Sequence, residues 1–268
     1  MDTNLTDKVV LVTGASQGIG EAIARAFYRE GAKVALVART QAKLDALARD
    51  LGDRALAVAA DVRDAASLAA AIEAAETRLG PIDVVVNNAG GIASTDGGLF
   101  RPFEAVSDED WFGTFDLNVM SAVRISRALA PKMAERGWGR IINISSESGV
   151  QPDPIAVEYA AAKGALNAMT KALSKAYGGR GVLVNVVSPA YVDTPIVRNV
   201  LSQMPGGGEI HPDQLAQHNL GAFRPNIVVG RPGKSEEIAA AVVFLASEAA
   251  SFITGSNLRV DGGSVATL

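Results

Sequence analysis

The chain has 268 residues, of which 48% are hydrophobic and 20% are charged, and its formal net charge at pH 7 is −4. This composition excludes a wholly disordered chain and predicts a globular protein with a sizeable core. The acidic balance argues against nucleic acid or an anionic membrane as a partner, and the longest apolar runs, such as residues 239–246, are too short to cross a bilayer. With no cysteine, two histidines and no signal or transit pattern, we expect a cytoplasmic protein without disulfides or a bound metal.

Short β-branched runs alternate with longer, alanine-rich segments of helical period along the whole chain. Strands are predicted at residues 8–12, 33–38, 55–60, 82–87, 140–145, 182–188 and 257–261, and helices near residues 19–30, 41–51, 64–79, 108–136, 155–177 and 235–247. Nearly continuous apolar strands are typical of a parallel sheet that helices cover on both faces. Because no linker or repeat interrupts the pattern, the sequence predicts one α/β domain over residues 1–268.

The first predicted strand runs into the sequence TGASQGIG at residues 13–20, where a helical pattern begins. Glycines in this strand-turn-helix context let the backbone turn tightly and approach a pyrophosphate at the helix N-terminus, although a turn with a packing role alone is the alternative. The second strand ends on Ala38 and Arg39, with Thr40 and Lys43 close behind. Where a carboxylate would hold a free ribose 2′-hydroxyl, an arginine suits a 2′-phosphate and predicts NADP(H).

Polar side chains follow the next three strands. Asp61 ends the third, residues 87–90 (NNAG) end the fourth, and Ser145 and Ser146 end the fifth. Each could be a strand-end turn by itself. Because the carboxyl ends of parallel strands meet at one edge of a sheet, we expect these side chains to outline a crevice there.

The sequence EYAAAKGALNAM at residues 158–169 places Tyr159 one helical turn before Lys163. Side chains at positions i and i+4 lie side by side on a helix, so the phenol and the ammonium share a pocket. A surface tyrosine stacked on a lysine stem is the alternative for an isolated pair. We expect the lysine charge to pull the pKa of the phenol down from about 10 toward neutral pH, which prepares it for acid–base chemistry.

Two glycine-rich segments interrupt the alternation, at residues 90–100 and, with three successive glycines, within residues 199–233. An insertion as long as the second is usually functional or disordered. We therefore expect residues 199–233 to form a lid over the substrate, and residues 90–100 to form a second mobile loop.

The motifs together resemble those of the short-chain dehydrogenase/reductase family, and in particular its 3-oxoacyl-[acyl-carrier-protein] reductase-like members. The resemblance rests on TGASQGIG (13–20), Asp61, NNAG (87–90), Asn118, Ser146, the Tyr159/Lys163 pair, SPAYVDTP (188–195) and FITGSNLRVDGG (252–263). Pro189-Ala190 stands where many members carry Pro-Gly. The resemblance implies a single-domain doubly wound Rossmann fold with a seven-stranded parallel sheet, a nicotinamide cofactor and a homotetramer.

The resemblance also implies a role for individual residues. Tyr159 is the expected general acid/base, Lys163 holds the nicotinamide ribose, Ser146 bonds the substrate oxygen, and Asn118 supports a water that relays protons. Cofactor contacts are implied at Gly14, Ser16, Gln17, Gly18, Ile19, Gly20, Arg39, Asp61, Val62, Asn88, Ala89, Gly90, Tyr159, Lys163, Pro189, Val192 and Thr194. Substrate contacts are implied at Ser146, Ser148 and Tyr191.

The function expected from these residues is NADP(H)-dependent interconversion of a ketone and a secondary alcohol, with NADP(H) preferred over NAD(H). A non-catalytic dinucleotide sensor or scaffold on the same fold is the alternative, because a fold does not fix a function. A sugar-nucleotide epimerase or dehydratase is a further alternative, although such enzymes usually add a substrate domain after the sheet. The small-molecule carbonyl or alcohol substrate stays open among a steroid, an acyl thioester, a sugar and a small diketone.

Overall fold

The computed structural model describes residues 3–95, 101–204 and 207–267, so parts of both glycine-rich segments, residues 96–100 and 205–206, lie outside the described residues. The strands are β1 (Val9–Thr13), β2 (Lys33–Ala38), β3 (Ala55–Ala59), β4 (Val84–Asn87), β5 (Gly139–Ile144), β6 (Val182–Pro189), β7 (Val192–Asp193), β8 (Gly233–Lys234) and β9 (Asn257–Val260). The helices are α1 (Gly18–Arg29), α2 (Gln41–Leu51), α3 (Ala65–Leu79), α4 (Asp108–Phe115), α5 (Ser121–Glu135), α6 (Val157–Tyr177), α7 (Pro195–Ser202), α8 (Pro212–Phe223) and α9 (Ser235–Ala246).

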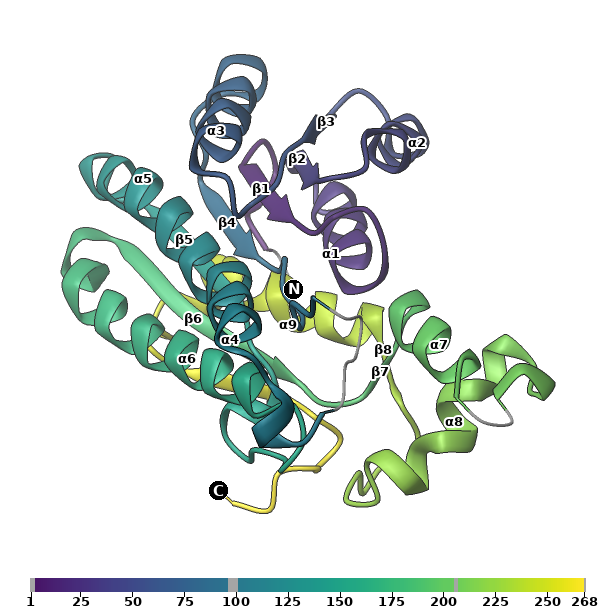
Figure 1. Cartoon of the computed structure of the whole chain (residues 1–268). Coiled ribbons are helices and arrows are strands. Elements are labelled where there is room, and N and C mark those ends of the chain that lie inside the picture. The colour runs from purple at the N-terminus through teal and green to yellow at the C-terminus, as the bar shows by residue number, and fades with distance from the viewer. Residues whose placement is uncertain (1–2, 96–100, 205–206, 268) are drawn as a thin grey trace.

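Seven strands form one sheet in the order β3-β2-β1-β4-β5-β6-β9, and every neighbouring pair is parallel. The order reverses between β1 and β4, so connections leave the sheet in opposite directions at that point. In an open α/β sheet this reversal opens a crevice at the carboxyl ends of the strands. The predicted doubly wound, seven-stranded parallel sheet is confirmed (Figure 1).

Two apolar layers hold helices to the two faces of the sheet. In β1, Val10 and Val12 join the layer under α1, α2 and α9, whereas Val9 and Leu11 join the layer under α3, α5 and α6. Successive side chains of a strand point to opposite faces, so a continuous apolar run serves both layers. Each fully buried aliphatic side chain contributes about 1.5–3 kcal/mol, so the apolar residues of the strands supply much of the energy that holds the helices to the sheet.

The predicted helix over residues 108–136 is divided in the structure. Helix α4 ends at Phe115, a five-residue π-helical turn covers Asp116–Met120, and α5 continues from Ser121. Such π turns insert a residue into the helical ladder and often occur at functional sites. The sequence pattern did not reveal it because the apolar residues keep a helical period on both sides.

Helices α7 and α8 form a lobe beside the sheet, which Figure 1 shows in green at the lower right. The lobe joins the rest of the chain through the two-residue strands β7 and β8, which pair in parallel. It has a small apolar core of its own, centred on Leu201, Leu215 and Ala216. The segment over residues 199–233, expected as a long loop, is therefore largely helical, and β7 and β8 were not predicted.

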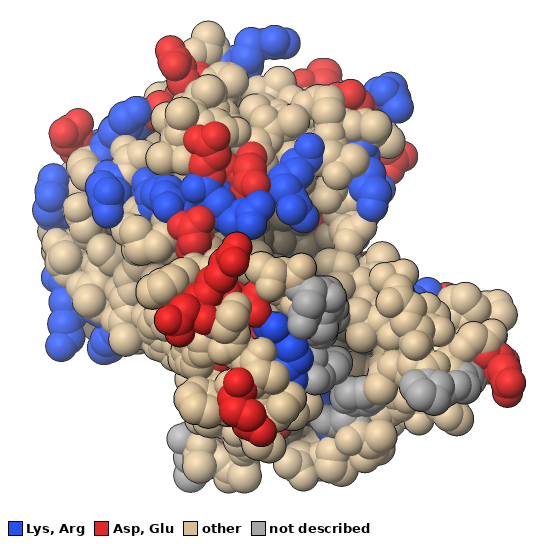
Figure 2. Space-filling model, viewed as in Figure 1, with Lys and Arg blue, Asp and Glu red and all other residues tan. Residues whose placement is uncertain are grey.

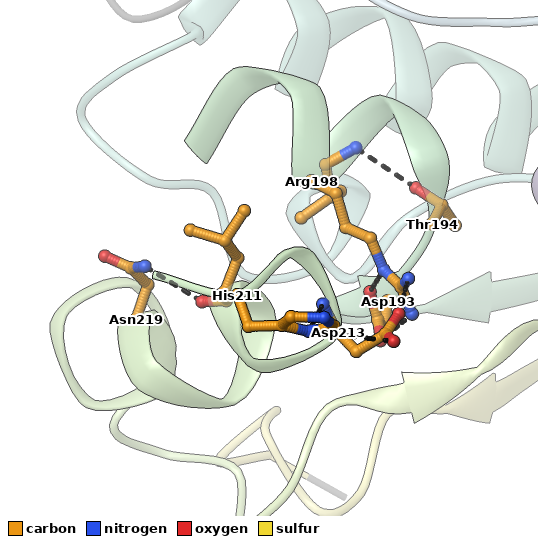
Figure 3. Close-up of polar contacts among 8 residues, drawn as sticks. Asp193, Thr194, Arg198, His211, Asp213 and Asn219 are labelled. Atoms are coloured by element: carbon orange, nitrogen blue, oxygen red, sulfur yellow. Dashed lines mark hydrogen bonds and ion pairs between the residues drawn. The ribbon is translucent and has the colours of Figure 1, made fainter. Parts of the chain in front are cut away.

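An arginine ties the two helices of the lobe to its base. The guanidinium of Arg198 makes a two-pronged contact with Asp193, with Nε–Oδ1 at 2.7 Å and Nη2–Oδ2 at 2.8 Å (Figure 3). A third guanidinium nitrogen binds Asp213 in the first turn of α8. Two-pronged contacts of this kind fix geometry as well as charge. Arg198 thus holds α7, α8 and β7 as one unit.

Charges of both signs mingle on the face seen in Figure 2. Several charged side chains pair across neighbouring elements, such as Lys132 with Glu76 at 2.7 Å. Exposed pairs of this kind contribute about 0–1 kcal/mol each, so they do not determine the fold. Within the described ranges, no helix combines the length and the apolar character that crossing a membrane requires.

Candidate active site

A cleft of about 840 Å³ opens at the carboxyl ends of the central strands, and the surface is hollowed between the α7–α8 lobe and the rest of the molecule (Figure 2). This volume is that of a site for a cofactor-sized ligand. The predicted site residues that line it are Gly14, Ser16, Gln17, Gly18, Ile19, Gly20, Arg39, Asp61, Val62, Asn88, Ala89, Gly90, Ser146, Tyr159, Lys163, Pro189 and Thr194. The fold therefore brings residues that are far apart in the sequence, from Gly14 to Thr194, to the lining of one cleft.

The glycine turn between β1 and α1 packs too tightly for side chains. A Cβ added to Gly20 would lie 2.2 Å from Gly14 O and 2.5 Å from Asn88 Nδ2, and Gly14 itself has a φ of 65°. Thr13 Oγ1 accepts hydrogen bonds from the backbone N–H groups of Asn88 and Ala89, both at 3.0 Å. The sequence analysis missed this threonine, whose signal is a polar residue at the end of an apolar strand. The turn is thus fixed against the end of β4, with room for a pyrophosphate.

Cations gather at the end of the cleft beyond β2. Arg39 is exposed and lines the cleft, and Lys43 Nζ donates to Gln17 Oε1 at 2.8 Å. Arg63, which the sequence analysis did not single out, pairs with Asp61 at 2.9 Å. The hydrogen bond from Arg63 holds the pKa of Asp61 below its usual value. The carboxylate here is therefore already neutralised, and this end of the cleft favours an anion.

Tyr159 and Lys163 face the cleft from successive turns of α6, as predicted. Lys163 is 3% exposed, and its Nζ donates to Ile144 O at 2.8 Å. The same nitrogen lies 5.4 Å from the centre of the Tyr159 ring. The end of β5 and the N-terminal half of α6 therefore place a phenol and a buried amine together, beside Ser146.

Burial dominates the protonation of this pair. It raises the pKa of Tyr159, while a hydrogen bond with Ser146 and the charge of Arg224 act in the opposite direction. Burial lowers the pKa of Lys163 to about 7. The pKa of the phenol is therefore raised, and not brought down toward neutrality as expected, because desolvation outweighs the Ser146 hydrogen bond and the charge of Arg224. At pH 7 Tyr159 is therefore a neutral phenol that can donate a proton.

Asn118 is 2% exposed and lies behind the cleft wall rather than on it. Its Nδ2 donates to Gly91 O at 2.6 Å and to Thr114 O at 2.8 Å, and its Oδ1 accepts from Gly91 N at 3.1 Å. A Cβ added to Gly90 would lie 2.7 Å from Asn118 Oδ1 and 3.1 Å from Lys163 Nζ. The π turn thus directs the amide toward the segment after β4, and Asn118 and Lys163 meet at the same glycine.

Three predicted contact residues are not among the residues that line this cleft. Ser148 is buried in the 3-10 turn after β5, where its backbone N–H donates to Ser146 Oγ at 3.2 Å. Tyr191 lines a second cavity of about 240 Å³ and packs on the core of the lobe. The side chain of Val192 belongs to the apolar core of the sheet. Thr194 does line the cleft, and its hydroxyl also caps α7.

The substrate contacts at Ser148 and Tyr191 and the cofactor contact at Val192 stay predictions. Ser146 keeps its predicted place.

An ion-pair cluster next to Ser146 was missed altogether. Arg224 directly follows α8, and its guanidinium contacts the carboxylate of Glu147 and, at 2.7 Å, that of Asp153. The Glu147 side chain is only 5% exposed. Residues 147 and 224 are 77 positions apart, so no local pattern could have indicated the pair.

Comparison with known proteins agrees with this geometry. A model of the family described as short chain dehydrogenase matches residues 8–205. The 3-oxoacyl-[acyl-carrier-protein] reductase FabG of Pseudomonas aeruginosa is 37% identical, over 97% of this chain and 98% of its own.

Two solved structures are similar over almost the whole chain. The L-sorbose reductase of Gluconobacter frateurii, complexed with NADPH and L-sorbose, has a TM-score of 0.90 and 35% identity, with all of both chains covered. The 3-ketoacyl-(acyl-carrier-protein) reductase of Brucella melitensis, complexed with NADH, has a TM-score of 0.84 and 34% identity, covering 97% of this chain and 99% of its own. The glycine turn, the Tyr159/Lys163 pair and these full-length similarities together identify the chain as a member of the short-chain dehydrogenase family of oxidoreductases.

Proposed function

We propose that this chain is an NADP(H)-dependent oxidoreductase that interconverts a ketone and a secondary alcohol, with Tyr159 as the general acid/base. The observation that carries the proposal is a single cleft that is lined both by a turn suited to a dinucleotide and by residues suited to acid–base chemistry. A glycine turn that suits a pyrophosphate lines it, and so do Ser146, Tyr159 and Lys163. A nicotinamide dinucleotide that spans the cleft would meet its substrate beside the phenol.

The residues divide the reaction between them. When bound, the cofactor supplies a hydride to the carbonyl carbon in reduction and accepts one in oxidation. Tyr159 donates its phenolic proton to the carbonyl oxygen, so one ketone, one hydride and one proton give the alcohol. Ser146 bonds the same oxygen and holds it at the phenol, and Lys163, with Asn118 behind it, returns a proton to Tyr159. In oxidation the same groups act in reverse, with the phenolate as the base.

NADP(H) is the proposed partner in preference to NAD(H). Arg39 and Lys43 line the part of the cleft beyond β2, and the nearby carboxylate of Asp61 is paired with Arg63. A planar guanidinium suits a ribose 2′-phosphate. A charge-assisted hydrogen bond is worth about 1.5–3 kcal/mol, or roughly ten- to a hundredfold in preference. The two similar structures carry NADPH in one case and NADH in the other, so this chain's own residues are the support.

The proposed substrate is a small ketone, with a ketose and a β-keto acyl thioester as the candidates suggested by the two similar reductases. The segment over residues 199–233, which includes the end of α7 and all of α8, is proposed as the lid over it. A cytoplasmic homotetramer remains part of the proposal.

The test is consumption of NADPH, followed by its absorbance, with L-sorbose, ethyl acetoacetate and a simple diketone, each repeated with NADH. Turnover that is lost in Tyr159→Phe supports the proposal, and Tyr177→Phe on the same helix is the matched control. Tight binding of NADPH without turnover of any ketone would favour the alternative of a non-catalytic sensor.

A further inference from the structure

Arg224 connects the α7–α8 lobe to the loop that carries Ser146. Its Nε contacts Glu147 Oε1, and its Nη2 lies 2.7 Å from Asp153 Oδ2. Both carboxylates belong to the connection between β5 and α6, whereas the arginine directly follows the last turn of α8. The contact therefore joins the lobe, whose Ile196 lines the cleft, to the loop whose Ser146 lines it too.

Glu147 has an unusual environment for a carboxylate. Its side chain is 5% exposed, and its Oε2 has no hydrogen-bond partner among the described residues. A buried carboxylate is costly unless a cation pairs with it, and removal of that cation leaves the charge uncompensated. Arg224 is the cation that pairs with it. Glu147 also follows Ser146 directly in the loop after β5.

The pair also acts on Tyr159. Among the described residues, the groups that act on this phenol are Ser146 and Glu147 from the loop after β5, Lys163 from α6, and Arg224 from the lobe. The negative charge of Glu147 raises the pKa of Tyr159, and the positive charge of Arg224 lowers it. The two members of one ion pair thus have opposite effects on the same phenol.

Movement of the lobe would carry the arginine with it. Arg198 fastens α7, α8 and the end of β7 to one another through Asp193 and Asp213 (Figure 3). Because the lobe has its own small core, it can shift as one body on its short connections at β7 and β8. Arg224 would then leave Glu147, and the carboxylate beside Ser146 would lose its counter-ion.

We propose that Arg224 is a positioning residue that couples docking of the α7–α8 lobe to the acid–base group Tyr159, with Glu147 as the contact through which it acts. With the lobe docked, the guanidinium neutralises the carboxylate and holds the Ser146 loop against α6. With the lobe displaced, the unpaired carboxylate opposes formation of the phenolate. The inference rests on the proposed function only in giving Tyr159 its chemical role.

The decisive measurement is the titration of the Tyr159 phenol in the NADP⁺ complex, by ultraviolet difference absorbance against Tyr159→Phe in each background. Arg224→Met removes a positive charge and leaves the carboxylate, so the apparent pKa of Tyr159 rises. Glu147→Gln removes a negative charge and leaves the arginine, so the pKa falls. Each shift is expected to be roughly half a unit or more, as for charges close to a titrating group.

Controls separate this charge effect from simple loss of a structural contact. Both variants break the same ion pair, so a purely structural role would move the phenol in the same direction in both, or not at all. Either result would overturn the proposal. Arg224→Lys is expected to keep most of the wild-type behaviour. Arg231→Ala, which removes another arginine of this segment with an ion pair to Glu237, is expected to leave the titration unchanged.

The double variant Arg224→Met with Glu147→Gln covers the case in which Arg224→Met alone does not fold. It removes both charges, so its phenol is expected to titrate between the two single variants, and a value outside that interval contradicts the coupling. Because the titration needs no turnover, it is independent of the proposed activity. If no ketone is reduced and the opposite shifts still occur, the proposed function fails and the coupling stands.

Discussion

Lys163 Nζ lies 5.4 Å from the centre of the Tyr159 ring and donates a hydrogen bond to the backbone oxygen of Ile144. The amine is therefore held by the end of β5, and its effect on Tyr159 is exerted through space. Burial lowers the pKa of Lys163 to about 7, so the amine is close to half-protonated at neutral pH. A group in this state can pass a proton in either direction.

Tyr159→Phe is expected to abolish turnover while NADPH still binds, because it removes the hydroxyl and keeps the ring. The kcat of ketone reduction checks the loss of turnover, and the Kd of NADPH, measured by fluorescence, checks that the cofactor still binds. Retention of more than roughly a tenth of the activity would mean that less than about 1.4 kcal/mol of transition-state stabilisation rests on that hydroxyl, and the assignment would be wrong.

Lys163→Met is expected to lower both turnover and NADPH affinity and to change how stability depends on pH. Between pH 7 and about 10 the folded lysine is neutral while the unfolded one is protonated, so the unfolded state binds more protons. The free energy of unfolding of the wild type therefore rises with pH across this window, by at most about 5 kcal/mol, and the cost of burial is fully present below it.

Urea unfolding at about pH 7 and about pH 9.5 tests that dependence. The wild type is expected to gain stability relative to Lys163→Met between the two conditions. Parallel changes in the two proteins would mean that the buried amine keeps its ordinary pKa.

Ala38→Asp combined with Arg39→Ile is expected to move cofactor preference toward NADH. The carboxylate would bond a free 2′-hydroxyl and repel a 2′-phosphate, and the lost guanidinium removes the charge that favours NADPH. The ratio of kcat/KM for the two cofactors should fall by roughly ten- to a hundredfold. Comparable kcat/KM for NADPH and NADH in the unmodified protein would show that Arg39 does not discriminate between them.

The α7–α8 lobe is expected to gain protection from hydrogen exchange when NADP⁺ and substrate bind together. Among the described residues, the core of the lobe has three buried members, Leu201, Leu215 and Ala216, so its helices can open locally at low cost. Peptides covering residues 195–204 and 212–223 report the change, and those of α3 serve as the internal control. Equal exchange with and without ligands would count against a lid.

A homotetramer is expected in solution from the family resemblance. Phe112 in α4 and Phe103 in the segment before it are exposed, with 74% and 62% of each residue accessible. Burial of such aromatic surface stabilises association. Sedimentation at micromolar concentration should give a tetramer, and Phe112→Glu should weaken it. A monomeric wild type at that concentration would remove the basis for this expectation.

The fold followed from local patterns in the sequence. The seven strands of the large sheet lie within two residues of their predicted bounds, because an apolar β-branched run buried on both faces leaves a signal in consecutive residues. The turn at residues 13–20 and the spacing of Tyr159 and Lys163 are local too. The sequence alone was therefore enough to identify the turn as a cofactor-binding turn and to place Tyr159 and Lys163 in one pocket.

Only the tertiary structure determined the features that depend on contacts between distant residues or on how far a side chain is removed from water. The break in the helix at Asn118, the helical lobe in place of a loop, and the burial of Ser148 depend on packing against neighbours. The pKa of Tyr159 is raised because desolvation outweighs its charged neighbours, and a sequence gives no measure of desolvation. Glu147 and Arg224, 77 residues apart, meet only because the α8 end of the lobe folds back onto the loop after β5.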